Sequence, residues 1–250
     1  MSRNQPRAAA EPLVTPAFLI LCFTSLLCLS MLVVREAQVG DARYRFLLWN
    51  LFLAWLPLVV SMAAAGANRL LAGMPAARGA MLLILGIGWL LLYPNAPYLT
   101  TDLIHLIMNP TYSWRQSSES LLLWYDLIVF FLFAWCGLLL GYLSMRQFHR
   151  LVSRYLGDAA GWLFIVAVSF LGGFGVYLGR VIRLNSWDVV FSPFRLANSV
   201  IGGINANGAI LTILFGMLIL IVYLSLYGLG FQRGPGQGGG VARDGAGGLS

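Results

Sequence analysis

Long apolar runs separated by short polar segments dominate the pattern of this 250-residue chain. A membrane-spanning helix needs about 20 predominantly apolar residues. Six segments meet this requirement, and nothing between them is long enough for a separate soluble domain. The pattern therefore predicts an all-α, polytopic membrane helix bundle with six spans, over residues 13–34, 46–65, 80–93 with a broken continuation, 121–145, 160–184 and 208–231.

We expect a single membrane domain over residues 13–231 between two short ends. Residues 1–12 form the expected N-terminal segment, where Arg3 and Arg7 precede an apolar run that favours an uncleaved signal anchor. Residues 232–250 contain eight glycines and almost nothing to bury, so we expect a disordered tail.

Composition and charge support a membrane location and suggest an orientation. The chain is 59% hydrophobic and 10% charged, and all 16 of its basic residues are arginine. Nine arginines fall on the side of the two termini and seven on the other, so the positive-inside rule favours cytoplasmic termini. Arg146, Arg150 and Arg154 form a basic stripe for which we expect anionic lipid headgroups as partners. We expect no nucleic-acid partner, and any protein partner is unknown.

The third span is broken at Pro94–Pro97, within LLLYPNAPYLTTDLIHL. The two prolines free backbone carbonyls, as in the unwound helices that line transporter cavities. Asn95 is suited to cap a new helix, on which Asp102 and His105 share a face. A carboxylate and an imidazole at membrane depth are costly unless they are paired or hydrated. The segment therefore indicates a polar site, with a plain kink as the alternative.

Polar residues of four spans are expected at one membrane face, because spans two and four begin where spans three and five end. Arg180 requires an anion, and Asp102 and Asp126 are the alternatives. The pairs Gly137/Gly141 and Gly175/Gly179 favour close packing of spans four and five, which would bring Asp126 toward Arg180. The catalytic candidates are Asp102, His105 and Asp126, the first two being also metal candidates; the ligand-binding candidates are Asn50, Asn95, Arg180, Arg183, Asn185 and Asp188.

Some of these residues also have plainer interpretations. Asp126 could snorkel within an aromatic belt beside Trp124. Arg180 could belong to an internal ion pair. His149, in the basic stripe, is expected to be a solvated surface residue.

Four motifs resemble one known family: LLWNLFLAWLP, WLLLYPNAPYLTTDLIHL, LLWYDLIVFFLFAW and GRVIRLNSWDVV. They are similar to bacterial integral membrane proteins grouped as domain-of-unknown-function family 1361, over roughly residues 45–225. The resemblance implies a multi-pass protein of the bacterial inner membrane. It implies no activity, cofactor or catalytic residue.

Three functions remain open at this point. The first is a ligand-binding or enzymatic site at the non-cytoplasmic face, with Arg180 or Arg183 holding an anionic group. The second is a transporter for a small solute or ion, although the polar groups crowd one face instead of following a path. The third is a structural subunit of a membrane complex. The sequence identifies neither a reaction nor a cofactor.

Overall fold

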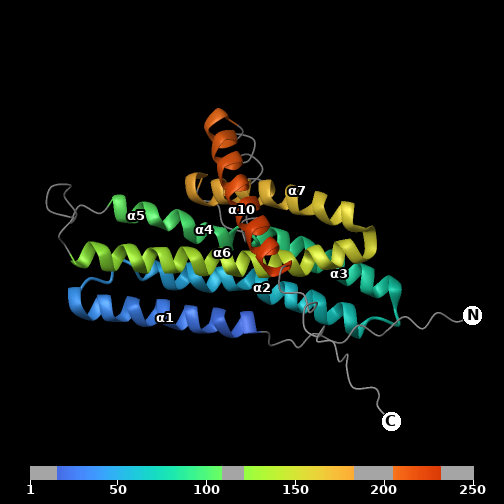
Figure 1. The fold of residues 1–250 in the computed structure, drawn as a ribbon, viewed down its shortest axis with the longest axis horizontal. Coiled ribbons are helices and arrows are strands. Elements are labelled where there is room, and N and C mark those ends of the chain that lie inside the picture. Colours follow the sequence, from blue (N-terminus) through green and yellow to red (C-terminus); the bar gives the residue numbers. More distant parts are fainter. Residues whose placement is uncertain (1–15, 109–120, 183–204, 232–250) are drawn as a thin grey trace, which may run out of the picture.

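The computed structural model describes residues 16–108, 121–182 and 205–231, and every regular element within these ranges is helical. Six helical segments are long and apolar enough to cross a membrane, which confirms the predicted all-α fold with six spans. The long helices (Figure 1) are α1 (Pro16–Val39), α2 (Phe46–Leu70), α3 (Pro75–Leu92), α6 (Leu121–Leu156), α7 (Asp158–Tyr177) and α10 (Ala206–Phe231).

Two of these helices continue through irregular turns. After α3 the chain passes through α4 (Asn95–Tyr98), the 3₁₀ helix η1 (Leu99–Leu103) and α5 (Ile104–Ile107). After α7 it forms the π-helix η2 (Leu178–Ile182). Both continuations lie toward the same end of the bundle as the first turns of α2 and α6, which is the left side of Figure 1.

Helices α1 and α6 extend beyond their predicted ends, and their extra turns carry arginines. Helix α1 runs to Val39, so Arg35 lies within it and not in the following loop. Helix α6 has 36 residues and is about 54 Å long at 1.5 Å per residue, well beyond a hydrocarbon core of about 30 Å. Its last turns, which carry the basic stripe, therefore extend past the apolar layer.

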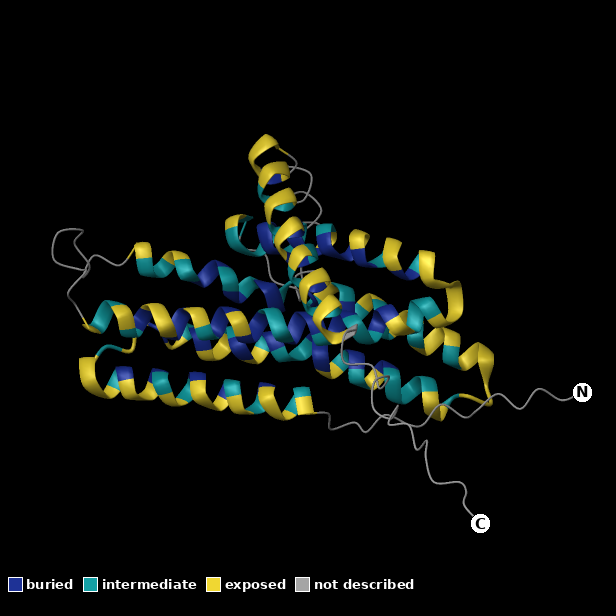
Figure 2. Ribbon diagram, in the orientation of Figure 1, coloured by how far each residue is buried: buried dark blue, intermediate teal, exposed yellow. Residues whose placement is uncertain are grey.

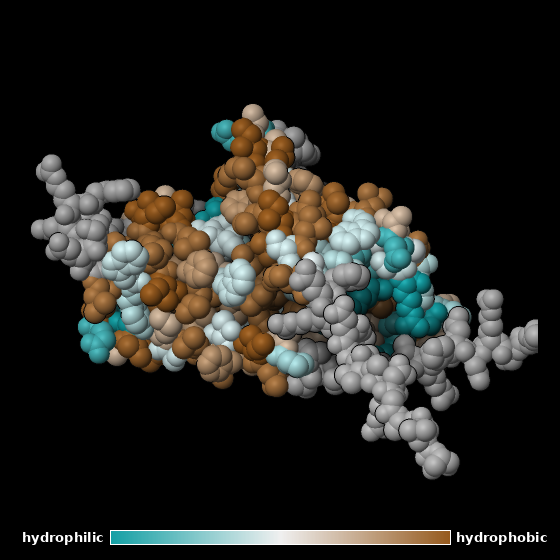
Figure 3. All heavy atoms as spheres, viewed as in Figure 1, coloured by the Kyte–Doolittle hydropathy of each residue, from teal (hydrophilic) through white to brown (hydrophobic). Residues whose placement is uncertain are grey.

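Helix α6 forms the centre of the bundle. It packs against α1, α2, α7 and η1, and buried residues gather along it while the outer helix faces are exposed (Figure 2). Many of the exposed residues are large and apolar, as lipid-facing positions require. Figure 3 shows one face, where hydrophobic residues cover most of the surface and the largest group of hydrophilic residues lies toward the right-hand end. Helix α10 packs chiefly on α7 and crosses the bundle steeply in Figure 1.

The break in the third span is a hydrogen-bonded helical bend, not an unwound stretch. The backbone N–H of Ala96 donates to the carbonyl of Tyr93, and that of Tyr98 donates to the carbonyl of Pro94. The hydroxyls of Thr100 and Thr101 bond to carbonyls three residues earlier. The prediction that the break frees backbone carbonyls, as in the unwound helices of transporters, is therefore wrong for Tyr93.

Asn95 also behaves differently from the prediction that it caps a helix. The N-cap of α4 is Pro94, with no side-chain capping bond. The Asn95 side chain instead donates from Nδ2 to the Leu92 carbonyl, at 2.9 Å. In a regular α-helix the Leu92 carbonyl would accept from the Ala96 N–H, which here donates to the Tyr93 carbonyl, so the Asn95 amide supplies the donor to Leu92.

Glycines of α6 and α7 hold the bend from two sides. A Cβ at Gly137 would lie 2.4 Å from the Ala96 carbonyl oxygen, and one at Gly175 would lie 2.2 Å from Pro94 Cγ. Helices α6 and α7 are neighbours, as predicted. These glycines, however, face the bend and not each other's helix. The absence of a side chain at each one lets the third span pack closely against α6 and α7.

Candidate functional site

Asp102 is the centre of a polar cluster built from three spans. It lies on η1 and is almost fully buried, with 1% of its surface exposed. Asn50, in the second turn of α2, donates from Nδ2 to Asp102 Oδ2 at 2.8 Å. Arg180, in η2, donates from Nη1 to Asp102 Oδ1 at 3.3 Å. Of the two anions considered for Arg180, the structure selects Asp102.

The Arg180 guanidinium contacts two more side chains of the bent span. Nη1 is 3.4 Å from the hydroxyl of Tyr98, one turn before Asp102. Nη2 is 3.1 Å from Nε2 of His105. Since a guanidinium only donates, His105 accepts through Nε2, and its own ring proton is on Nδ1. We name Asn50, Tyr98, Asp102, His105 and Arg180 the Asp102 cluster.

Local backbone geometry explains how this cluster forms. The 3₁₀ turn of η1 and the π-turn of η2 are departures from α-helix that occur often at functional sites. Together they place Asp102 and Arg180 opposite each other. The Arg180 side chain is 24% exposed while that of Asp102 is 1% exposed, so the cluster opens to its surroundings on the arginine side.

Asp126 belongs to a different pair, contrary to the expectation that it would approach Arg180. Arg35 of α1 donates to both of its carboxylate oxygens, Nε to Oδ1 at 2.7 Å and Nη2 to Oδ2 at 3.1 Å. The side chains are 3% and 0% exposed, so Asp126 does not snorkel in an aromatic belt. The Tyr44 ring covers the guanidinium at 4.0 Å, and the Tyr125 hydroxyl bonds to the Met31 carbonyl.

Aromatic rings lie between the two Arg–Asp pairs. Tyr44, which covers Arg35, contacts the ring of Phe46 edge-on, with centroids 6.4 Å apart. Phe46 in turn packs on His105 at 4.7 Å. The two pairs are therefore neighbours at one end of the bundle, separated by apolar surface instead of sharing one cavity.

The other candidates do not extend the cluster. Asn95 lies in the bend with the contact described above. Arg183, Asn185 and Asp188 fall outside the described residues. Within the ranges that the structure describes, no group of three His, Cys, Asp or Glu side chains could hold a metal ion. The guanidinium that contacts both Asp102 and His105 also opposes a cation between them.

His149 is buried, contrary to the prediction of a solvated surface residue. Only 5% of it is exposed. Its Nδ1 lies 2.6 Å from the hydroxyl of Tyr223 on α10, and the ring of Trp162 packs against its edge. Because α6 continues past the predicted end of the span, His149 faces α7 and α10 while the neighbouring arginines face away.

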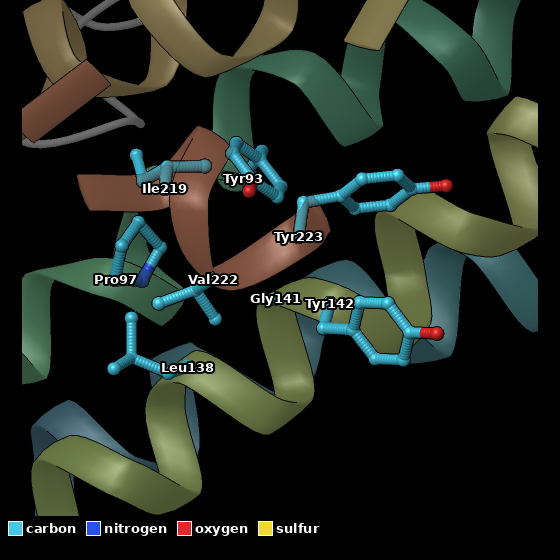
Figure 4. A pocket seen from close by; sticks show the side chains of 8 residues that line it. All are labelled: Tyr93, Pro97, Leu138, Gly141, Tyr142, Ile219, Val222 and Tyr223. Carbon is cyan, nitrogen blue, oxygen red and sulfur yellow. The ribbon is translucent and has the colours of Figure 1, made fainter. Parts of the chain in front are cut away.

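A small cavity lies between α3, α4, α6 and α10 (Figure 4). Its volume of about 10 Å³ is room for at most one water molecule. The cavity is therefore a packing gap beside Gly141 and is too small for a larger ligand. The lining residues are Tyr93, Pro97, Leu138, Gly141, Tyr142, Ile219, Val222 and Tyr223.

Sequence reasoning missed the role of Arg35. Arg35 lies one residue beyond the predicted span 13–34, yet α1 continues for another turn beyond it. The sequence feature that could have predicted this role is Asp126 in the fourth span, because a carboxylate within a span requires a cation at the same depth. Tyr98, whose hydroxyl lies beside Arg180, was not among the predicted site residues.

Comparison with known proteins identifies a family and nothing finer. No curated protein and no solved structure matches the chain. The matching family model is described as "Protein of unknown function (DUF1361)" and covers residues 49–222, which include all of the Asp102 cluster. The predicted resemblance is thereby confirmed, and the chain belongs to the DUF1361 family, as a protein with six helices able to span a membrane.

Proposed function

We propose that the Asp102 cluster binds an anionic ligand, such as a phosphate or carboxylate group, and that Arg180 is the contact residue. The observation that carries the proposal is the contrast between a sealed carboxylate and an open guanidinium. Asp102 is 1% exposed and Arg180 24% exposed. Asp102 therefore holds the buried side of the Arg180 guanidinium, while the other side of the guanidinium stays accessible.

Arg180 keeps capacity for a ligand. A guanidinium has five N–H donors, and the described residues supply three acceptors: Asp102, Tyr98 and His105. The bond to Asp102 is long for a charged pair, so it does not hold the arginine in a closed fork. A planar guanidinium matches two oxygens of a phosphate or carboxylate, which gives the site a preference for such groups.

His105 becomes a proton acceptor beside the bound anion when Arg180 turns from its Nε2 to the ligand. Its Nε2 already faces Arg180, and its ring rests on Phe46. A ligand that carries its own proton, such as a monohydrogen phosphate, could share that proton with the imidazole. The same residue would serve as acid or base if the bound molecule is a substrate.

Inorganic phosphate is a suitable first probe for the proposal. Thermal unfolding of the full chain in detergent is measured with increasing phosphate, and ligand binding to the folded state should raise Tm. Arg180→Gln should abolish the rise, whereas Arg43→Gln, an exposed arginine at the same end, should leave it intact. A wild-type Tm that ignores phosphate, or an equal rise in Arg180→Gln, contradicts the proposal.

We also propose that the chain lies in the bacterial inner membrane with both termini in the cytoplasm, so that the Asp102 cluster faces outward. The arginine bias supports this orientation. A chain without its native cysteines, carrying either Ala42→Cys or Gly73→Cys, tests it with an impermeant maleimide on intact cells. Labelling should occur at position 42 and not at position 73; the reverse pattern inverts the orientation.

A further inference from the structure

A groove at the opposite end of the bundle is lined by arginines. It has a volume of about 600 Å³ and lies between the start of α1, the last turns of α2 and the last turns of α6. Arg146, Arg150 and Arg154 of α6 line it together with Arg69 of α2. The basic stripe predicted from the sequence is thus one wall of a groove and not an isolated helix face.

The lining is amphipathic. None of its described residues is acidic, so the four guanidinium groups give it a positive field. Phe18, Leu58 and Met62 line the same groove and supply apolar surface. An occupant with both an anionic group and an apolar chain would match both parts.

The height of the groove in the membrane agrees with such an occupant. The stretch of α6 from Asp126 to Arg150 is about 36 Å long, slightly more than a hydrocarbon core. If the Arg35–Asp126 pair lies near one surface of the apolar layer, Arg150 lies at the headgroups of the other. The apolar lining residues then lie at the depth of the acyl chains.

We propose that this groove binds one anionic phospholipid, with its phosphate among the arginines and an acyl chain along Phe18, Leu58 and Met62. The volume far exceeds a free phosphate ion, and a soluble anion would leave the apolar wall uncovered.

The test is native mass spectrometry of the full-length protein in detergent with added lipid. Wild type should bind one phosphatidylglycerol more tightly than phosphatidylcholine. Arg146→Gln should weaken that binding about fivefold, the typical effect of one basic residue near an anionic surface. The matched control is Arg78→Gln, since Arg78 begins the neighbouring helix, stacks on Tyr155 and lies outside the groove.

Several outcomes would overturn the inference. Equal binding of phosphatidylglycerol and phosphatidylcholine would show that the groove has no preference for an anionic lipid. Equal weakening by Arg78→Gln and Arg146→Gln would show a general attraction of the basic surface instead of a specific site. Full competition by soluble glycerol phosphate shows a free anion site instead of a lipid site. Arg180→Gln should leave lipid binding unchanged, which separates this groove from the Asp102 cluster at the other end.

Discussion

Two arginine–aspartate pairs that join different helices lie at the same end of this bundle, yet they are built differently. Arg35 grips both oxygens of Asp126, at 2.7 and 3.1 Å, and both side chains are sealed. Arg180 reaches one oxygen of Asp102, at 3.3 Å, and divides its remaining bonds between a phenol and an imidazole. The first pair joins α1 to α6; the second joins the bent span to η2.

The difference separates a structural pair from an adaptable one. A sealed, bidentate pair has no donor facing outward, and breaking it leaves a charge in an apolar interior. A guanidinium that is open on one side and loosely held can exchange partners when a ligand arrives. The Arg35–Asp126 pair therefore stabilises the fold, whereas the Arg180–Asp102 pair leaves a guanidinium available for a ligand.

The largest expected effect is at the sealed pair. Asp126→Asn should lower the free energy of unfolding by about 3–5 kcal/mol, because Arg35 then stays buried without a counter-charge. Equilibrium unfolding in mixed detergent measures it. The double variant Arg35→Met/Asp126→Leu should recover most of the loss; a single variant as stable as wild type would show that the pair is not structural.

The next effect concerns the bend that carries the Asp102 cluster. Gly175→Ala places a methyl group against Pro94 and should cost about 1–3 kcal/mol. Because Arg180 follows on the same span, phosphate binding should weaken as well. Gly66→Ala is the matched control, since a Cβ there meets nothing within 4 Å. Equal stability of the two alanine variants would contradict the close fit of the bend.

A smaller loss is expected for the same chemical change at the open pair. Asp102→Asn keeps a side chain that can bond to Asn50, and the partly exposed Arg180 can turn toward water. The free energy of unfolding should fall by about 1–2 kcal/mol, well below the loss for Asp126→Asn. If the two Asp→Asn variants lose equal stability in the same detergent titration, the contrast between the pairs fails.

A loss of similar size is expected at Arg180 itself. Arg180→Gln removes a partly exposed charge but leaves Asp102 buried with the Asn50 amide and the introduced amide as its donors, so the free energy of unfolding should fall by about 1–2 kcal/mol. Its insertion and expression should match wild type, which quantitative membrane immunoblotting checks. A collapse in protein level would make Arg180 a structural residue.

The sequence predicted the span count, the bend and the membrane end at which polar residues gather. Hydrophobic run lengths determine the first, Pro94 and Pro97 the second, and alternation of span direction the third. It also placed Asp102 and His105 on one face, because residues three apart on a helix meet.

The partners of each charge could not be predicted in the same way. Asp102 and Asp126 were both possible partners of Arg180. Which of them pairs with Arg180 depended on the helices that the glycines contact. Gly137 and Gly175 were expected to join α6 and α7, but they clasp the bend, which carries Asp102 to Arg180. Asp126 was then left for Arg35, whose place depended on α1 running five residues past the predicted end. Such choices are tertiary and leave little trace in local pattern.

The most direct measurement of the central claim is NMR of arginine side chains. All 16 basic residues of the chain are arginine, so ¹⁵N labelling of this one amino acid reports on each guanidinium. Arg180→Gln and the double variant Arg35→Met/Asp126→Leu assign the two resonances. During a titration with inorganic phosphate, the Nε resonance of Arg180 should shift and saturate while that of Arg35 stays in place. A stationary Arg180 resonance, or equal shifts of both, would contradict the division into an open binding pair and a sealed structural pair.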